Sequence, residues 1–151
     1  MTTSPVAVTE TQILKWTLQL CNSLEANYSQ DHIDSLHLII KACEVKGQNS
    51  DFAKKQVIDY EEGEAKLMKF RVHPTRKYLK IIKQQFDTGR NEYRDESVHA
   101  FVDKQTGQVY KPAGWEKPAK HVRYDLSNPI HREYVFNPKN VDWSGGYLYL
   151  R

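Results

Sequence analysis

Residues 99–126 read HAFVDKQTGQVYKPAGWEKPAKHVRYDL, and this stretch decides the fold. Val98, Ala100 and Val102 occupy every second position before the segment Asp103-Lys104-Gln105-Thr106-Gly107, and Val109 continues the apolar pattern after it. A glycine at the end of such a loop can adopt a positive φ without a Cβ clash, as a type I turn followed by a left-handed residue requires. The stretch therefore predicts an antiparallel β-hairpin.

Two further strands are predicted before this hairpin. Apolar and basic side chains alternate over residues 68–72, which is the two-residue period of a half-buried strand. His73-Pro74-Thr75-Arg76 is a turn candidate, and residues 78–86 form a second apolar run. Together with the hairpin, these segments predict consecutive antiparallel strands.

Prolines dominate the sequence after the hairpin and predict irregular structure or short helical turns there. They stand at positions 112, 118, 129 and 138. Gly145-Gly146 then leads into the apolar end Tyr147-Leu148-Tyr149-Leu150, for which we expect either an edge strand or a plug in the core.

The N-terminal part has helical spacing. Thr9 and Gln12 match a capping box, and apolar residues then recur every three or four positions, which predicts a helix over residues 9–27. Asp31 is a second N-cap candidate and Gly47 ends the following periodic segment, although LHLIIKACEV within that segment also fits a buried strand. Residues 51–60 are a candidate third helix.

This order places the chain in the α+β class, with two or three N-terminal helices packed on an antiparallel β-meander of about four strands and an irregular Pro-rich C-terminal segment. A length of 151 residues is that of one ordinary domain. We therefore expect a single domain over residues 1–151, helical and acidic over 1–64, and β-rich, basic and rich in tyrosine over 65–151.

The sequence also predicts a soluble protein of the cytoplasm. No stretch approaches the ~18 apolar residues of a membrane span, and the start MTTSPVAVTETQ lacks the basic and apolar regions of a signal peptide. Cys21 and Cys43 lie in apolar periodic segments without a CxxC motif, so buried free thiols are expected rather than a disulfide or a zinc site.

Charge is unevenly distributed along the chain. Residues 1–64 hold five Lys/Arg against ten Asp/Glu, whereas residues 65–151 hold seventeen against nine, together with thirteen of the seventeen aromatic residues. Basic and aromatic side chains in one region favour an anionic partner, with nucleic acid as the first hypothesis. The alternative is that these charges only solvate the protein surface.

The strongest candidate surface lies on the basic strands. Residues 66–83 hold seven Lys/Arg and no acidic residue, and cations at alternate positions of a strand share one face. The candidate nucleic-acid contacts are Lys69, Arg71, Arg76, Lys77, Tyr78, Lys80, Lys83, Lys104, Lys111, Lys117, Lys120 and Arg123. The competing interpretation is an edge strand whose lysines prevent aggregation.

Three aromatic residues are candidate anchors for a protein partner: Trp115, Tyr147 and Tyr149. Trp115 stands between Pro112 and Pro118, and its alternative role is to fold back over the sheet and close the core. A host protein or a second copy of the chain is therefore the alternative partner to nucleic acid.

Catalytic motifs are absent from the sequence. Asp59, Glu64 and Lys66 faintly match the acid and lysine set of a metal-dependent nuclease, but an acidic loop matches this spacing by chance. His32 and His37 are five residues apart, the wrong separation for one metal on a helix. We expect no cofactor and no metal, and a non-enzymatic binding protein ahead of an enzyme.

The hairpin also carries a resemblance. Its pattern V-x-A-F-V-D-x-x-T-G-x-V-Y-K-x-A-x-W-x-x-P-A-K, over residues 98–120, and the ending GGYLYLR are similar to those of small uncharacterised proteins of tailed bacteriophages, notably cyanophages. The likeness covers residues 76–126 and 145–151, while residues 1–64 depart from the shorter helical start of that group. The resemblance implies a phage accessory protein acting in the cytoplasm of a bacterial host, and it carries no known activity.

Overall fold

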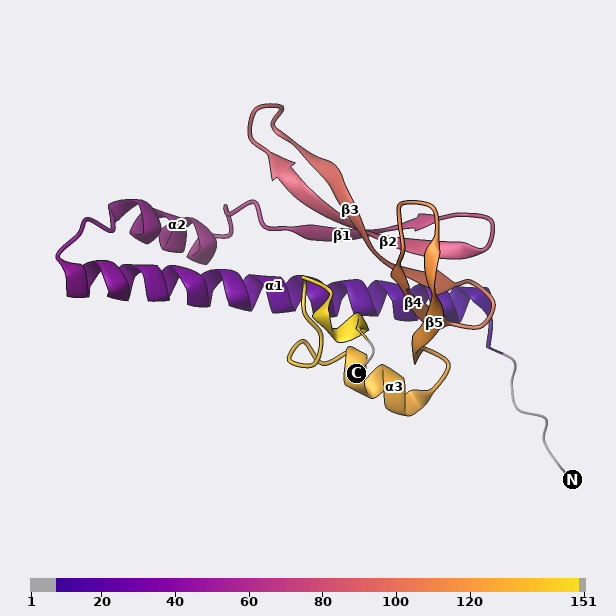
Figure 1. Cartoon of the computed structure of the whole chain (residues 1–151). Helices are drawn as coiled ribbons and strands as arrows, with labels where there is room; N and C mark the ends of the chain where they lie inside the picture. Colours follow the sequence, from indigo (N-terminus) through magenta and orange to yellow (C-terminus); the bar gives the residue numbers. More distant parts are fainter. Residues whose placement is uncertain (1–7, 150–151) are drawn as a thin grey trace, which may run out of the picture.

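The structure is a computed structural model that describes residues 8–149, and it has the α+β architecture expected from the sequence (Figure 1). The elements are α1 (Glu10–Lys46), α2 (Asp51–Glu61), β1 (Lys69–Pro74), β2 (Tyr78–Asp87), β3 (Glu92–Asp103), β4 (Gln108–Pro112), β5 (Pro118–Asp125), α3 (Pro129–Val135) and the short 3-10 helix η1 (Gly146–Leu148). Among these residues, no helix is both long enough and apolar enough to cross a membrane.

Helix α1 is one continuous helix of 37 residues, so the predicted break near residues 28–30 is wrong. The capping box of Thr9 and Gln12 and the end at Gly47, with φ of 67°, are both confirmed. Asp31 does not cap a second helix, because it lies inside α1, and its carboxylate accepts a hydrogen bond from Trp143 Nε1 at 3.1 Å. The segment LHLIIKACEV is likewise helical and not a buried strand.

The predicted third helix is confirmed as α2, which folds back along the second half of α1 (Figure 1). Ala53 is buried between the two helices, and the hydroxyl groups of Ser29 and Tyr60 lie 2.8 Å apart. This helical hairpin extends past the sheet, and it leaves several large apolar side chains exposed. They are Leu38, Ile39, Val45, Phe52 and Ile58.

The strands that the structure describes form one five-stranded sheet. Neighbouring strands are antiparallel, and their order in the sheet follows the chain, β1-β2-β3-β4-β5. The meander thus has one strand more than expected, because Pro118–Asp125 forms β5 where irregular structure was predicted. Pro112 ends β4 and Pro118 begins β5, so the two prolines frame a hairpin instead of interrupting a strand.

The pairing of β2 with β3 is irregular at two places, between Ile81 and Ile82 and between Lys83 and Gln84, and the first of these is a β-bulge at His99. Ile81 pairs with Ala100, but Ile82 pairs with Val98, so His99 is an extra residue in β3. Val98 therefore faces away from Ala100, and the prediction that Val98, Ala100 and Val102 share one face is wrong for Val98.

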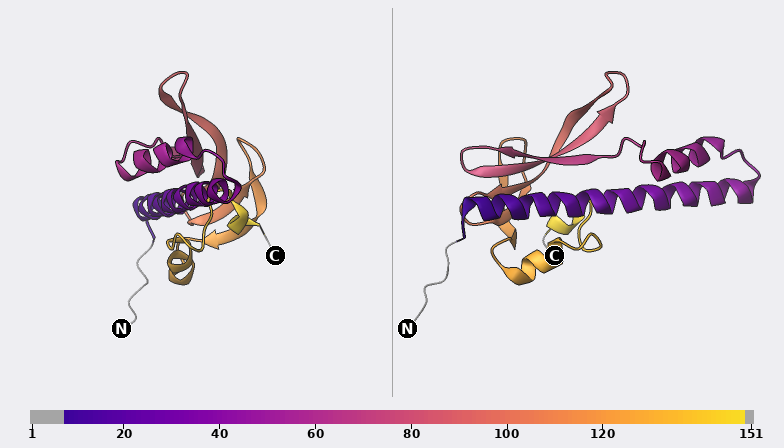
Figure 2. Two further views of the ribbon diagram at one scale, coloured as in Figure 1. Left: turned by 90° about the vertical axis from the view of Figure 1, so that its left-hand side faces the viewer. Right: turned by 180° about the vertical axis from the view of Figure 1, so that it is seen from behind.

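Two apolar clusters lie on opposite faces of the sheet. The main core fills the space between the sheet and α1, which itself lies between the sheet and α3 (Figure 2). Its buried members are Ile13, Leu20, Cys21, Leu24, Met68, Phe70, Leu79, Ile81, Ala100, Val102, Val109, Leu126, Val135, Val141, Tyr147 and Leu148. The second, smaller cluster consists of Ile82, Val98 and Phe101 with the half-buried Tyr78 and Tyr110.

The cysteines are free thiols, as predicted. Burial, with a smaller contribution from Glu25, raises the pKa of Cys21 to about 12, so this thiol stays protonated at neutral pH. Cys43 is only half-buried.

The C-terminal segment packs back onto α1. Trp143 N donates to Asn27 Oδ1 at 3.0 Å, and Asn27 Nδ2 donates to the carbonyl of Pro138 at 3.0 Å. Of the two roles expected for the apolar end, the core plug is confirmed for its described part, since Tyr147 and Leu148 are buried. Leu150 lies outside the described residues.

The predicted turn between β3 and β4 depends on Gly107. Its φ is 81°, and its N–H donates to the carbonyl of Asp103 at 2.9 Å. A Cβ at this position would lie 3.3 Å from the backbone nitrogen of Ser127.

We therefore expect Gly107→Ala to lower the free energy of unfolding by about 1–2 kcal/mol. Gly114→Ala is the matched control, because a Cβ there meets open space, and its effect should stay below about 0.5 kcal/mol. Chemical denaturation measures both, and equal effects would contradict this account of the turn.

Acid stability should depend on His99, which is buried against the ring of Phe70 and the hydroxyl of Tyr147. Burial lowers its pKa from 6.5 to about 4, with Asp142 opposing the shift and Lys83 adding to it. The unfolded chain binds a proton below pH 6.5 but the folded protein binds it only near pH 4, so stability falls as pH falls through this window.

The expected loss is about 3 kcal/mol. Urea unfolding at several pH values measures it, and His99→Gln should remove this part of the pH dependence. His121→Gln changes an exposed histidine and should retain it. An unchanged pH profile in His99→Gln would show that another group titrates.

Candidate nucleic-acid interface

The predicted basic residues do not form one continuous surface. On β1, Arg71 is compensated by an acid, since its Nε donates to Asp95 Oδ1 at 2.9 Å. The Arg71 guanidinium is the main cause that lowers the pKa of Asp95 to about 2, so the pair stays charged at neutral pH. Lys69 is exposed, and its Nζ lies 4.3 Å from the centre of the Tyr93 ring.

Lys80, one of the predicted nucleic-acid contacts, is buried and does not belong to an exposed basic face. It is 5% exposed, and its Nζ lies 3.1 Å from Glu116 Oε2. Strand β2 has neighbours on both sides, and Glu116 reaches Lys80 from the hairpin between β4 and β5. Because the exposed carboxylate of Glu116 already pairs with the Lys80 ammonium group, we do not count Lys80 among the cations that lack an acidic partner.

Arg76, Lys77 and Lys104 come together at one end of the sheet, and we call these three residues the basic cluster. The turn after β1 carries Arg76 and Lys77, the turn after β3 carries Lys104, and the N–H of Lys104 donates to the carbonyl of Lys77 at 3.1 Å. The three side chains line one hollow with Gln105 and two acids, Glu10 and Asp103, and Asp103 Oδ1 accepts hydrogen bonds from the backbone N–H groups of Gln105 and Thr106. Within residues 8–149, no carboxylate lies within ion-pair distance of any of them.

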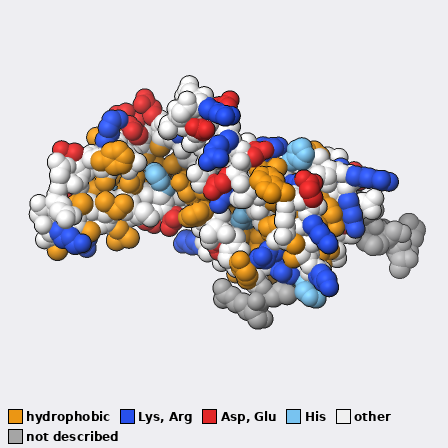
Figure 3. Space-filling model, turned by 45° about the horizontal axis from the view of Figure 1, so that its top comes forward, with side chains coloured by type: hydrophobic (Ala, Val, Ile, Leu, Met, Phe, Trp, Pro, Cys, Tyr) orange, Lys and Arg blue, Asp and Glu red, His pale blue; other side chains and the backbone are white. Residues whose placement is uncertain are grey.

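The space-filling view shows Lys and Arg side chains gathered over the end of the molecule opposite the α1–α2 hairpin (Figure 3). This is the end at which the turns after β1 and β3 lie (Figure 1). The excess of Lys and Arg in the second part of the sequence therefore gathers at one end of the molecule, and not along one face of the strands.

Two tyrosines lie beside the basic cluster on the sheet face opposite α1. Tyr78 and Tyr110 are half-buried, and both belong to the small cluster around Phe101. The Tyr78 ring contacts Phe101 and Tyr110 edge to face, at centroid distances of 5.5 and 6.4 Å. Lys77 Nζ lies 5.4 Å from the centre of the Tyr78 ring.

Tyr110 was not among the predicted contacts. A usable signal was the cross-strand register of the hairpin, which places Tyr110 opposite Phe101 and Phe101 opposite Lys80. The pairing of Tyr110 with Phe101 follows from the turn at Gly107, whereas the pairing of Phe101 with Lys80 depends on the two irregularities of the β2–β3 pairing.

The other predicted cations lie elsewhere. Lys117 and Lys120 are exposed on the hairpin of β4 and β5. Arg123 is used within the fold, because its Nε donates to the carbonyl of Leu148. Lys83 and Lys111 line a separate pocket beside the C-terminal segment.

The three predicted anchors also differ in exposure. Tyr147 is buried, so it does not serve as a surface anchor, and this prediction is wrong. Tyr149 is 61% exposed. Trp115 is 49% exposed at the tip of the hairpin, so it does not close the core.

The nuclease hypothesis gains no support from the geometry. The Asp59 carboxylate faces Lys55 at 3.4 Å, and Lys66 Nζ lies 5.5 Å from the centre of the Phe86 ring. In the part of the chain that the structure describes, no three His, Cys, Asp or Glu side chains are grouped so that they could hold a metal ion.

Comparison with known proteins gives one finding. No curated protein matches the chain, and no solved structure matches it either. A family model described as "Family of unknown function (DUF7717)" matches residues 2–150. Because the match spans nearly the whole sequence, the chain belongs to this family of unknown function.

Proposed function

We propose that the protein binds single-stranded nucleic acid at the basic end of the sheet. The observation that carries the proposal is the convergence of the basic cluster with Tyr78 and Tyr110, which come from separate strands and turns. Cations that lack a carboxylate partner are free to neutralise phosphates, and adjacent aromatic rings offer surfaces on which bases stack.

A single strand suits this surface better than a duplex. The two tyrosines lie on the sheet face and are half-buried, so only unpaired bases could reach their rings. Arg76 and Lys77 are exposed and Lys104 is half-buried at the rim of the hollow, where a sugar-phosphate backbone would pass. Three phosphate contacts on a single strand give a slope of log K against log salt of about −2.

The resemblance of the hairpin to tailed-phage proteins supports a setting for this activity. We place the proposed binding in the cytoplasm of a phage-infected bacterium, as an accessory function without catalysis. Nucleic acid is abundant in that setting.

The α1–α2 hairpin favours a second candidate function, a protein-interaction or structural module. Val45 is 82% exposed and Phe52 78% exposed, and apolar side chains gather over this end of the molecule (Figure 3). Contiguous exposed apolar surface is typical of protein interfaces. A protein that sediments as a dimer and binds no nucleic acid at low salt would support this second function over the first.

The first test reverses or removes the charge of the basic cluster. We expect Arg76→Glu, Lys77→Glu and Lys104→Gln together to weaken binding of a labelled single-stranded oligonucleotide at least ~10-fold and to flatten its salt dependence. Fluorescence anisotropy at low and physiological salt measures both. The matched control, Lys41→Glu, Lys54→Glu and Lys139→Gln, makes the same change in net charge at exposed positions elsewhere. Equal weakening in both variants would show that only net charge matters.

A second test removes the aromatic ring of Tyr110, on which a base would stack, and keeps an apolar side chain in contact with Phe101. Tyr110→Leu should preserve packing on Phe101 and weaken single-strand binding by about 1–3 kcal/mol, the range for one stacked base. Tyr134→Leu is the matched control, because it makes the same change at a 45% exposed tyrosine of α3, away from the basic cluster. Unchanged affinity in Tyr110→Leu, with the fold confirmed by thermal unfolding, would remove Tyr110 from the interface.

A further inference from the structure

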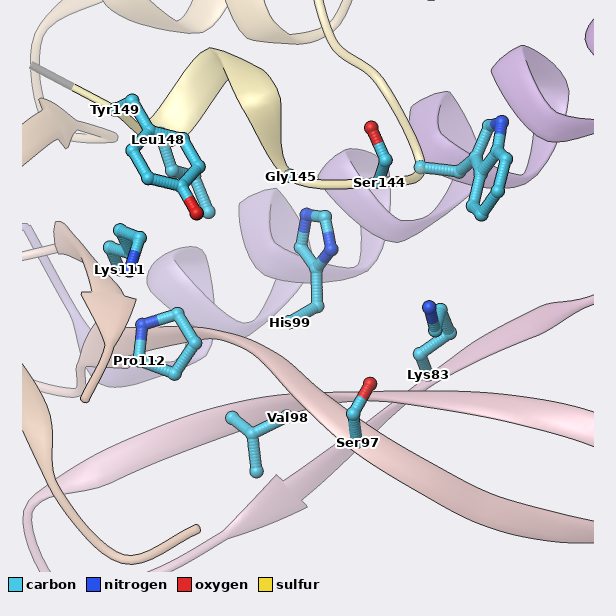
Figure 4. A pocket seen from close by; sticks show the side chains of 11 residues that line it. Lys83, Ser97, Val98, His99, Lys111, Pro112, Ser144, Gly145, Leu148 and Tyr149 are labelled. Atoms are coloured by element: carbon cyan, nitrogen blue, oxygen red, sulfur yellow. The ribbon is translucent and has the colours of Figure 1, made fainter. Parts of the chain in front are cut away.

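A separate pocket lies between the sheet and the C-terminal segment (Figure 4). Its volume is about 140 Å³. Strands β2 and β3 contribute Lys83, Ser97 and His99, strand β4 contributes Lys111, and the segment from Trp143 to Tyr149 forms the opposite wall. None of these side chains belongs to the basic cluster.

The two lysines of the pocket have aromatic neighbours but no acidic partner. Lys83 Nζ lies 5.5 Å from the centre of the Trp143 ring, and Lys111 Nζ lies 4.7 Å from the centre of the Tyr149 ring. Neither forms an ion pair with a carboxylate among residues 8–149, and both side chains are half-buried. Two half-buried ammonium groups in one cavity create a positive potential that an anion would relieve.

Neutral hydrogen-bond donors complete the pocket. The Ser97 hydroxyl forms no hydrogen bond with another described residue, so it is free to donate. His99 Nε2 lies 2.8 Å from the Tyr147 hydroxyl, which has no other hydrogen-bond partner among the described side chains. If the buried hydroxyl donates to Nε2, the proton of the neutral imidazole resides on Nδ1, the nitrogen left for a ligand. Figure 4 shows the imidazole extending from β3 toward Gly145.

One carboxylate lies behind the pocket wall. Asp142 accepts hydrogen bonds from the Ser144 hydroxyl at 2.6 Å and from the backbone N–H groups of Gly146 and Tyr147 at 2.7 and 3.1 Å. Its charge is therefore engaged by the C-terminal segment itself. The pocket lining keeps two cations and no carboxylate.

The cavity has room for a small anion. A water molecule takes up ~30 Å³ in the liquid, so the pocket accommodates a group of at least about four or five heavy atoms. A tetrahedral oxyanion has this size, and its oxygens accept hydrogen bonds from ammonium, hydroxyl and imidazole donors.

The geometry points to a phosphate site in this pocket, held by Lys83 and Lys111 with Ser97 and His99 as neutral donors. The ligand is inorganic phosphate or the phosphate group of a mononucleotide, whose base would meet the exposed ring of Tyr149 at the rim. This inference does not depend on the proposed nucleic-acid function, because the two sites share no residue.

The test titrates the full-length protein with inorganic phosphate and, separately, with adenosine monophosphate. Calorimetry gives the affinity, and amide chemical shifts locate the site. We expect saturable binding of phosphate with shift changes at Ser97 and Gly145. Tighter binding of the nucleotide, with further changes at Tyr149, would identify the monoester as the source, and equal or weaker binding would identify the free ion.

Lys83→Met and Lys111→Met keep an apolar stem over Trp143 and Tyr149, and each should weaken phosphate binding at least ~10-fold. The control, Lys41→Met with Lys54→Met, changes two exposed lysines of α1 and α2 outside both sites and should leave phosphate affinity unchanged. The inference would be overturned if neither phosphate nor adenosine monophosphate bound saturably, or if the chemical-shift changes were confined to the basic cluster. It would also be overturned if both pocket variants bound phosphate as tightly as the unaltered protein. The pocket variants should still bind oligonucleotide as the unaltered protein does, so failure of this site is distinguishable from failure of the proposed function.

Discussion

The extra residue His99 in β3 is the constraint on which the two faces of the sheet depend. In a regular strand His99 would point away from Ala100, but the bulge leaves it facing the C-terminal segment together with the main core. Val98 then turns to the opposite face, where it packs with Ile82 and Phe101. The bulge at His99 therefore has two results. It places Val98 in the small apolar cluster with Tyr78 and Tyr110, and it places the His99 imidazole in the wall of the pocket.

The second organising feature is the attachment of the C-terminal segment to α1. Asn27 uses both ends of its amide, donating to Pro138 and accepting from Trp143. Asp31 holds the indole of the same tryptophan, and the Tyr28 ring packs against it edge to face at 5.5 Å. These contacts explain why α1 continues through residues 28–31, since the polar side chains that suggested a helix end have tertiary partners instead.

Features set by neighbouring residues could be predicted from the sequence. The Thr9 capping box, the left-handed Gly47 and the Gly107 turn each depend on a few adjacent positions, and all three are present. Strand β5 and the bulge at His99 were not predicted, because the positions of prolines and the alternation of apolar residues do not show which residues pair across strands. In the candidate interface, the exposed turn residues Arg76 and Lys77 lie at the surface as expected, whereas Lys80 is buried on a strand with neighbours on both sides, and its ion-pair partner Glu116 comes from a later hairpin.

The contact between Asn27 and Trp143 also has a meaning for the order of folding. The strands pair with their neighbours in sequence, so most of the sheet forms by closing short loops, whereas this contact joins residues 116 positions apart. Loop closure costs more entropy as the loop lengthens, and contacts of high sequence separation are therefore expected to form after local ones. The pocket whose wall runs from Trp143 to Tyr149 would then come into existence only at the last step, when the chain end docks on a helix and sheet that are already assembled.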